Sequence, residues 1–129
     1  MKILKISAPL ILAATVLAAC AGNAVQSAGP ARVSEGVLTG ANGMTLYTFD
    51  KDPEGRGKSV CNGPCATNWP PLLVTADQAA APGYSVVMRD DGGKQWAYKG
   101  KPLYFWVKDQ KPGDRTGDGF NGVWRVAKP

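Results

Sequence analysis

The chain has no histidine among its 129 residues. This absence excludes a histidine general base, histidine activation of a nucleophile and histidine metal ligands. Cysteine is also scarce, with three residues, and pairing of two of them leaves too few soft ligands for zinc or copper. We therefore expect no metal, no cofactor and no catalytic residues, and we predict that the protein is not an enzyme.

Concentrated charge of one sign is missing as well. The formal net charge is +5, from 15 lysine and arginine residues against 10 aspartate and glutamate residues. The basic residues are spread along the chain, whereas a nucleic-acid surface needs a basic stripe on one face. We therefore expect no nucleic-acid partner.

No apolar run reaches the roughly 20 residues that a membrane-spanning helix needs. The N-terminus instead combines Lys2 and Lys5 with a short apolar stretch and small residues before Cys20. This pattern is typical of an export signal peptide, and its end resembles the lipobox of bacterial lipoproteins. The resemblance implies that residues 1–19 are removed and that Cys20 is lipidated and anchors the protein in a membrane.

The segment after Cys20 differs in composition from the rest of the chain. Residues 20–35 are rich in small and polar residues and contain no aromatic residue, which favours a flexible tether. Ala21 stands where inner-membrane lipoproteins have an aspartate, so we expect the outer membrane, on the face toward the periplasm. Residues 36–129 form the folded domain.

Short apolar runs separated by turn residues fill this domain and predict an all-β, antiparallel fold. No window keeps a helical apolar period for three turns. One helical turn is expected near residues 64–68 or 76–80, and Asn42-Gly43 predicts a hairpin between the first two strands. The predicted strands are Val37–Thr39, Met44–Phe49, Leu72–Val74, Tyr84–Met88, Gln95–Tyr98, Leu103–Val107 and Val123–Val126.

The domain also contains an internal repeat, over about residues 36–75 and 84–129. A Tyr-x-aromatic-x-x-Asp motif occurs twice, each time followed by glycine-rich residues and a tryptophan. We expect two pseudo-symmetric hairpin or meander units that share one core. The motif residues are Tyr47, Phe49, Asp52 and Trp69 in the first half and Tyr104, Trp106, Asp109 and Trp124 in the second.

These motifs, together with Cys61-x-x-x-Cys65-Ala66 and Trp69-Pro70-Pro71-Leu72, resemble a family of bacterial secreted-repeat lipoproteins. The resemblance covers the whole domain, and it implies no activity because none is established for that family. Physical chemistry supplies a structural role for the motif. Tyrosine and the aromatic residue two positions on share one face of a strand, and the aspartate can accept backbone N–H bonds in the following turn.

The cysteines and tryptophans leave alternatives open. One nearby cysteine pair in an exported chain predicts a structural disulfide between Cys61 and Cys65, although the same pair would serve a thiol–disulfide carrier. An exposed binding platform for a sugar or peptide could be formed by Trp69, Trp96, Tyr98, Trp106 and Trp124, although small domains also use tryptophan as core. We favour a non-catalytic binding or envelope accessory module of unknown partner. The alternatives are the thiol–disulfide carrier and an accessory protein in metal handling or electron transfer.

Overall fold

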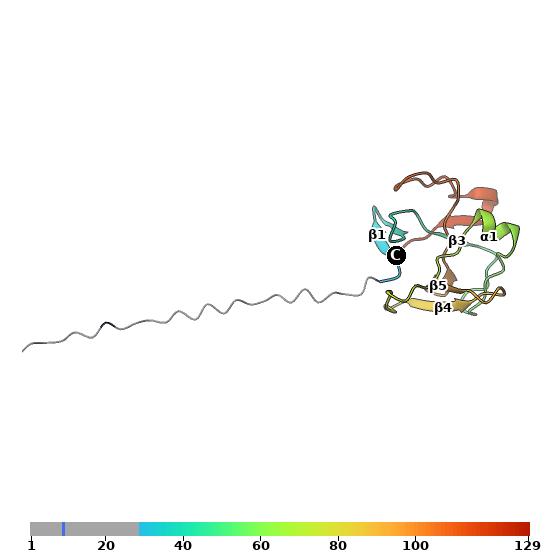
Figure 1. Cartoon of the computed structure of the whole chain (residues 1–129). Helices are drawn as coiled ribbons and strands as arrows, with labels where there is room; N and C mark the ends of the chain where they lie inside the picture. Colours follow the sequence, from blue (N-terminus) through green and yellow to red (C-terminus); the bar gives the residue numbers. More distant parts are fainter. Residues whose placement is uncertain (1–8, 10–28) are drawn as a thin grey trace, which may run out of the picture.

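The computed structural model describes residue 9 and residues 29–129 (Figure 1). Apart from residue 9, the predicted signal peptide lies outside the described residues, as do Cys20 and most of the predicted tether. Within the described part of the chain, no helix is long and apolar enough to cross a membrane.

The described chain is built from short strands joined by long loops. In chain order the elements are β1 (Arg32–Ser34), β2 (Val37–Thr39), β3 (Tyr47–Phe49), α1 (Pro64–Asn68), β4 (Tyr84–Met88), β5 (Lys94–Tyr98), β6 (Lys101–Pro102), the 3-10 turn η1 (Phe120–Gly122) and β7 (Trp124–Val126). The strands form three antiparallel sheets, β1–β2, β3–β7 and β4–β5–β6. The all-β antiparallel prediction is confirmed, and the helical turn is at 64–68 rather than 76–80.

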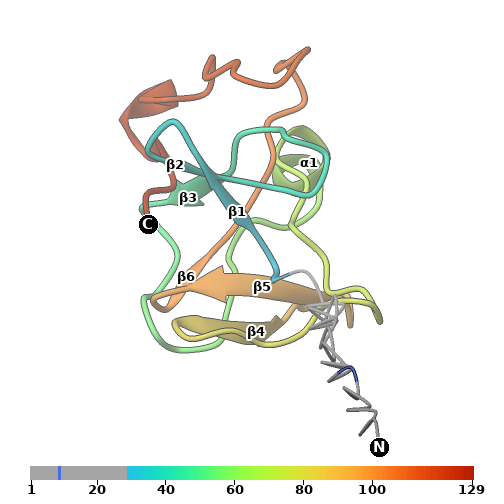
Figure 2. The same cartoon turned by 90° about the vertical axis from the view of Figure 1, so that its left-hand side faces the viewer.

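The three sheets are joined by isolated bridges into one folded unit. Figure 2 shows β4, β5 and β6 on one side of the domain, with β2, β3 and α1 on the other. Tyr104 bridges to both Tyr47 and Pro71, and Leu73 bridges to Gln95. These single bridges carry backbone hydrogen bonding from β3 across to β5.

The predicted tether extended too far toward the domain. Residues 32–34 are not tether, because they form β1 and pair with β2 through a two-residue turn at Glu35 and Gly36. Both turn residues have positive φ, 49° and 79°, as a type I′ hairpin requires. All three β1 side chains are exposed, so the sequence of β1 has no apolar pattern that would predict a strand.

The hairpin predicted at Asn42-Gly43 is present only in part. The turn closes through a hydrogen bond from the Gly43 N–H to the Gly40 carbonyl. Beyond it a single bridge, Thr39 to Thr45, follows before β3 leaves to pair with β7. The predicted strands at Leu72–Val74 and Leu103–Val107 are also wrong as regular strands, since each contributes only isolated bridges.

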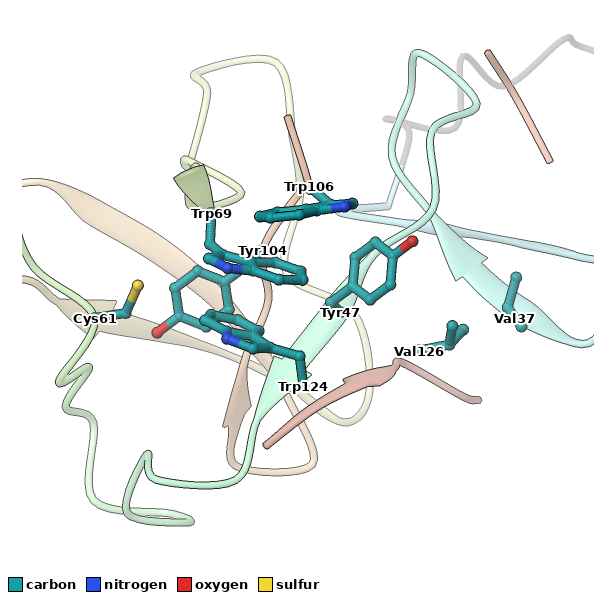
Figure 3. Packing of buried hydrophobic residues seen from close by; sticks show 8 residues of the cluster. All are labelled: Val37, Tyr47, Cys61, Trp69, Tyr104, Trp106, Trp124 and Val126. Carbon is teal, nitrogen blue, oxygen red and sulfur yellow. The ribbon is translucent and has the colours of Figure 1, made fainter. Parts of the chain in front are cut away.

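Buried side chains form two adjacent apolar clusters rather than one core. The first holds Val37, Tyr47, Cys61, Trp69, Tyr104, Trp106, Trp124 and Val126 (Figure 3). The second holds Leu38, Leu46, Leu72, Trp96, Leu103 and Ala127. Consecutive residues such as Leu103 and Tyr104 enter opposite clusters because side chains alternate across extended backbone. Segments buried on both faces therefore have continuous apolar runs, not alternating patterns.

Candidate functional site

The two motif tyrosines meet where the halves of the domain join. The Tyr47 N–H donates to the Tyr104 carbonyl at 2.8 Å, and the Tyr104 N–H donates to the Tyr47 carbonyl at 3.0 Å. Such mutual bonds define a hydrogen-bonded antiparallel pair. Equivalent residues of the two repeats therefore face each other about an approximate twofold axis.

The side chains of these tyrosines reach across that axis. The Tyr47 hydroxyl donates to Oδ2 of Asp109 at 2.6 Å, and the Tyr104 hydroxyl donates to Oδ2 of Asp52 at 2.5 Å. Each phenol thus bonds the carboxylate of the opposite repeat. The motif is completed between repeats and not within one.

The second oxygen of each carboxylate holds the loop that follows the motif. Oδ1 of Asp52 accepts the Val60 N–H at 2.8 Å. Oδ1 of Asp109 accepts the Thr116 N–H at 3.0 Å and the Thr116 hydroxyl at 2.6 Å. The backbone acceptor role expected of the aspartates is present, seven or eight residues farther along the chain.

The motif rings form a continuous stack across the same axis. Trp69 stacks on Trp124 at 3.8 Å between ring centroids and on Trp106 at 3.9 Å, and Trp124 stacks on Phe49 at 4.3 Å. Figure 3 shows Trp69 between Trp106 and Trp124. Each tryptophan packs on an aromatic residue of the other repeat, so the stack also ties the halves together. Aromatic pairs contribute about 0.5–1.5 kcal/mol each beyond burial.

Comparison with known families identifies both halves. The model of a secreted repeat of unknown function matches residues 32–73 and 85–128. The chain belongs to this secreted-repeat family. Searches of curated proteins and of solved structures give no significant match. The repeat boundaries agree with the symmetry of the structure, since one motif copy lies in each matched range.

Burial governs the ionisation of the secreted-repeat motif. Desolvation, and next the bond to Asp109, raises the pKa of Tyr47 well above its usual range, and desolvation and Asp52 do the same for Tyr104. Burial also raises the pKa of Asp52, although its hydrogen bonds and the charge of Arg89 act in the opposite direction. The phenols are therefore fixed as neutral donors at any physiological pH.

A buried arginine attaches to one of the two tyrosine–aspartate pairs. Nη1 of Arg89 donates to the Ser59 hydroxyl at 3.1 Å and to Oε1 of Gln95 at 2.8 Å, and Nη2 donates to the Cys61 carbonyl at 2.7 Å. Its Nε has no hydrogen-bond partner, and Oδ2 of Asp91 lies 3.7 Å away. The Ser59 hydroxyl also bonds the Tyr104 hydroxyl at 2.6 Å. The Ser59 hydroxyl therefore links the charged guanidinium group of Arg89 to the motif.

The predicted disulfide is present and lies beside this network. Cys61 and Cys65 are bonded, with their Cα atoms 5.2 Å apart. Cys61 has no exposed surface, and Cys65 on α1 is half-buried against the first apolar cluster. The bond fixes the loop that carries the Cys61 carbonyl toward Arg89.

The tryptophans do not form an exposed platform. All four, Trp69, Trp96, Trp106 and Trp124, are between 3% and 6% exposed. The four tryptophans are therefore core, whereas Tyr98 is half-buried.

A cleft of ligand size lies between the β3–β7 and β5–β6 sheets. It has a volume of about 540 Å³, within the range of small-molecule sites. Its residues are Thr48, Glu54, Tyr98, Lys99, Lys101, Leu103, Asp118, Arg125, Val126, Ala127 and Lys128. This cleft could not be predicted from the sequence, because its residues come from five separate segments with no common motif.

Proposed function

We propose that this secreted-repeat protein is a lipoprotein anchored through Cys20 to the outer membrane and facing the periplasm. There it acts as a non-catalytic binding or accessory module. Membership of a secreted family supports a location outside the cytoplasm. The signal peptide and lipobox supply the finer prediction of a lipid anchor.

The main observation in favour of a binding role is that the motif residues are used to build the fold. Six of its eight residues are buried and the other two are half-buried, and its phenols and carboxylates bond each other or residues of the neighbouring loops. None is free to act on a substrate, so the repeats serve as a scaffold. A scaffold held at a membrane by a tether acts through the surface that it presents.

The thiol–disulfide carrier finds less support. Exchange needs an attacking thiolate to reach one sulfur, and Cys61 is completely buried. We expect a reduction potential below about −300 mV, as for structural bonds of exported proteins. A role in metal handling also finds less support. Among the described residues, no three or more acidic, cysteine or histidine side chains lie close enough together to hold a metal ion.

Membrane fractionation tests the anchor. We expect Cys20→Ala to release the protein, because each buried methylene of a lipid chain contributes about 0.8 kcal/mol. We expect Ala21→Asp to stay membrane-bound and to move to the inner membrane. Retention of Cys20→Ala in the membrane contradicts the lipid anchor, and Ala21→Asp staying in the outer membrane contradicts the sorting argument.

Crosslinking in intact cells tests the binding role. The anchored protein is compared with residues 1–31 fused to an unrelated soluble domain, a chain that has the anchor and lacks the repeats. We expect a molecule enriched only with the repeat domain. Equal recovery from both chains rejects a binding module.

A further inference from the structure

We propose that the cleft between β3–β7 and β5–β6 binds a small amphiphile with an acidic headgroup, such as a phosphate or carboxylate on a short apolar chain. This inference rests on the binding role proposed above and names the ligand class. We call this site the lysine cleft, with Lys99, Lys101 and Lys128 at its rim and Leu103, Val126 and Ala127 as its apolar base.

The base of the lysine cleft is apolar and well packed. Leu103 is 0% exposed, Ala127 3% and Val126 8%, so these positions are fixed by the core beneath them. The half-buried ring of Tyr98 adds an aromatic wall. A short alkyl chain can lie against the apolar atoms that remain exposed in the cleft and lose part of its contact with water, at about 25 cal/mol per Å² of apolar surface buried.

The rim carries an excess of uncompensated positive charge. Lys99, Lys101 and Lys128 are exposed, and none is among the ion pairs of the described residues. The other basic residue, Arg125, is neutralised by Asp50 at 2.9 Å.

Two carboxylates also line the cleft. Asp118 is occupied as an acceptor for the Val126 N–H at 3.1 Å. That leaves Glu54 as the one carboxylate at the cleft without an ion pair or hydrogen bond in the described structure. Three ammonium groups against the two carboxylates of Glu54 and Asp118 leave a net positive charge, which favours an anion.

One of the three ammonium groups is held in place before any ligand binds. Lys99 and Gly100 have φ values of 49° and 80°, the left-handed pair of the β5–β6 turn. The Nζ of Lys99 lies 5.2 Å from the centroid of the Tyr98 ring, within the range of a cation–π contact. The ammonium group is therefore positioned at the edge of the apolar wall, where a headgroup would lie.

The test titrates the full-length lipidated protein, in nanodiscs of phosphatidylcholine, with hexyl phosphate, and subtracts empty discs. We expect hexyl phosphate to bind more tightly than inorganic phosphate, and hexanol not to bind. We expect Lys99→Gln/Lys101→Gln/Lys128→Gln to weaken binding about tenfold or more, because charge-assisted contacts are lost. Glu54→Gln, which removes the free carboxylate, should tighten it.

The matched control is Lys51→Gln/Lys94→Gln/Lys108→Gln, which makes the same change in net charge at exposed lysines outside the cleft. This control should bind within roughly twofold of wild type. Equal loss in both triple variants, or no hexyl phosphate binding by the wild type, overturns the proposal. A photoactivatable phosphatidylglycerol in the disc separates the two sources, since crosslinking to the cleft identifies a lipid headgroup and its absence a soluble ligand. Neither result alters the crosslinking test of the binding role, which can succeed with a ligand of other chemistry.

Discussion

The two copies of the motif make the same bonds in different surroundings. Around Tyr104 and Asp52, the network continues through Ser59 to the buried charge of Arg89. Around Tyr47 and Asp109, it ends on the backbone, where the Gly117 N–H donates to the Tyr47 hydroxyl at 3.3 Å. The phenol, the carboxylate and the stacked rings therefore build the fold, and the arginine and disulfide are additions around one of the two tyrosine–aspartate pairs.

Gly117 shows how closely the simpler half is packed. A Cβ at this position would lie 2.6 Å from the ring of Trp69, which is far inside van der Waals contact. The ring of one repeat rests on the backbone of the other, and only glycine leaves room for it. Side chains fill and satisfy the network of Tyr104 and Asp52, whereas the network of Tyr47 and Asp109 depends on close approach of the Gly117 backbone.

The largest expected effect on stability comes from the aromatic stack that the two halves share. Trp106→Ala should lower the free energy of unfolding by about 3–5 kcal/mol, because Trp106 is buried at one end of the stack. Phe49→Ala, at the half-buried other end, should cost less, about 2–3 kcal/mol. Urea denaturation of both variants measures the difference. A Trp106→Ala protein as stable as wild type would show that the stack is not part of the core.

The next prediction concerns the arginine that extends the network of Tyr104 and Asp52. Arg89→Met should cost about 3 kcal/mol, because it leaves Gln95 and the Cys61 carbonyl buried without their donor. Arg115→Met, at an exposed position in the second half, should stay within about 0.5 kcal/mol of wild type. Equal effects in the same denaturation experiment would mean that the buried charge does not matter to the fold.

The disulfide should contribute less than the arginine. Closing so short a loop removes little entropy from the unfolded chain, so Cys61→Ala/Cys65→Ala should cost about 2 kcal/mol. We expect dithiothreitol to lower the melting temperature of wild type and to leave that of the double variant unchanged. Unfolding of the whole domain on reduction would make the disulfide a global support, contrary to this prediction.

The smallest expected effect on stability comes from the Asp52 carboxylate. Asp52→Asn should cost about 1–2 kcal/mol, and the cost should depend on pH. Since the folded pKa of Asp52 is raised above its ordinary value of 3.8, the folded state holds this proton more tightly than the unfolded chain. Its contribution is complete below the unfolded pKa and is lost as pH rises through the folded pKa.

Thermal melts between pH 3 and 7 measure this contribution. The stability difference between wild type and Asp52→Asn should shrink as pH rises over the acidic range. Asp109→Asn in the same series measures the equivalent phenol–carboxylate bond in the other half. A difference for Asp52→Asn that grows with pH would contradict the raised pKa.

Several features of the fold could be predicted because they depend on local chemistry. Glycines at turns and short apolar runs indicated antiparallel strands, and two equal motifs indicated two halves. The partners of Tyr47 and Tyr104 could not be predicted, because a repeat shows which residues are equivalent and not which ones touch. The same sequence pattern would result whether each motif tyrosine bonds the aspartate five residues along its own repeat or the aspartate of the other repeat.

Arg89 and β1 were missed for different physical reasons. A charged residue at a strand end usually indicates an exposed position, and only the acceptors gathered around Arg89 make its burial possible. The β1 strand buries no side chain and depends on backbone bonds and a type I′ turn. Each depends on contacts that the local sequence does not contain.

The reciprocal bonds between Tyr47 and Tyr104 have a consequence for chains that carry a single such unit. One unit alone has a phenol without its carboxylate and a carboxylate without its phenol, and two identical copies about a true twofold axis would satisfy both. The present chain is equivalent to a covalently fused homodimer. Fusion releases the two copies from the requirement to be identical, and it permits an arginine and a disulfide on one side of the axis with a bare glycine on the other.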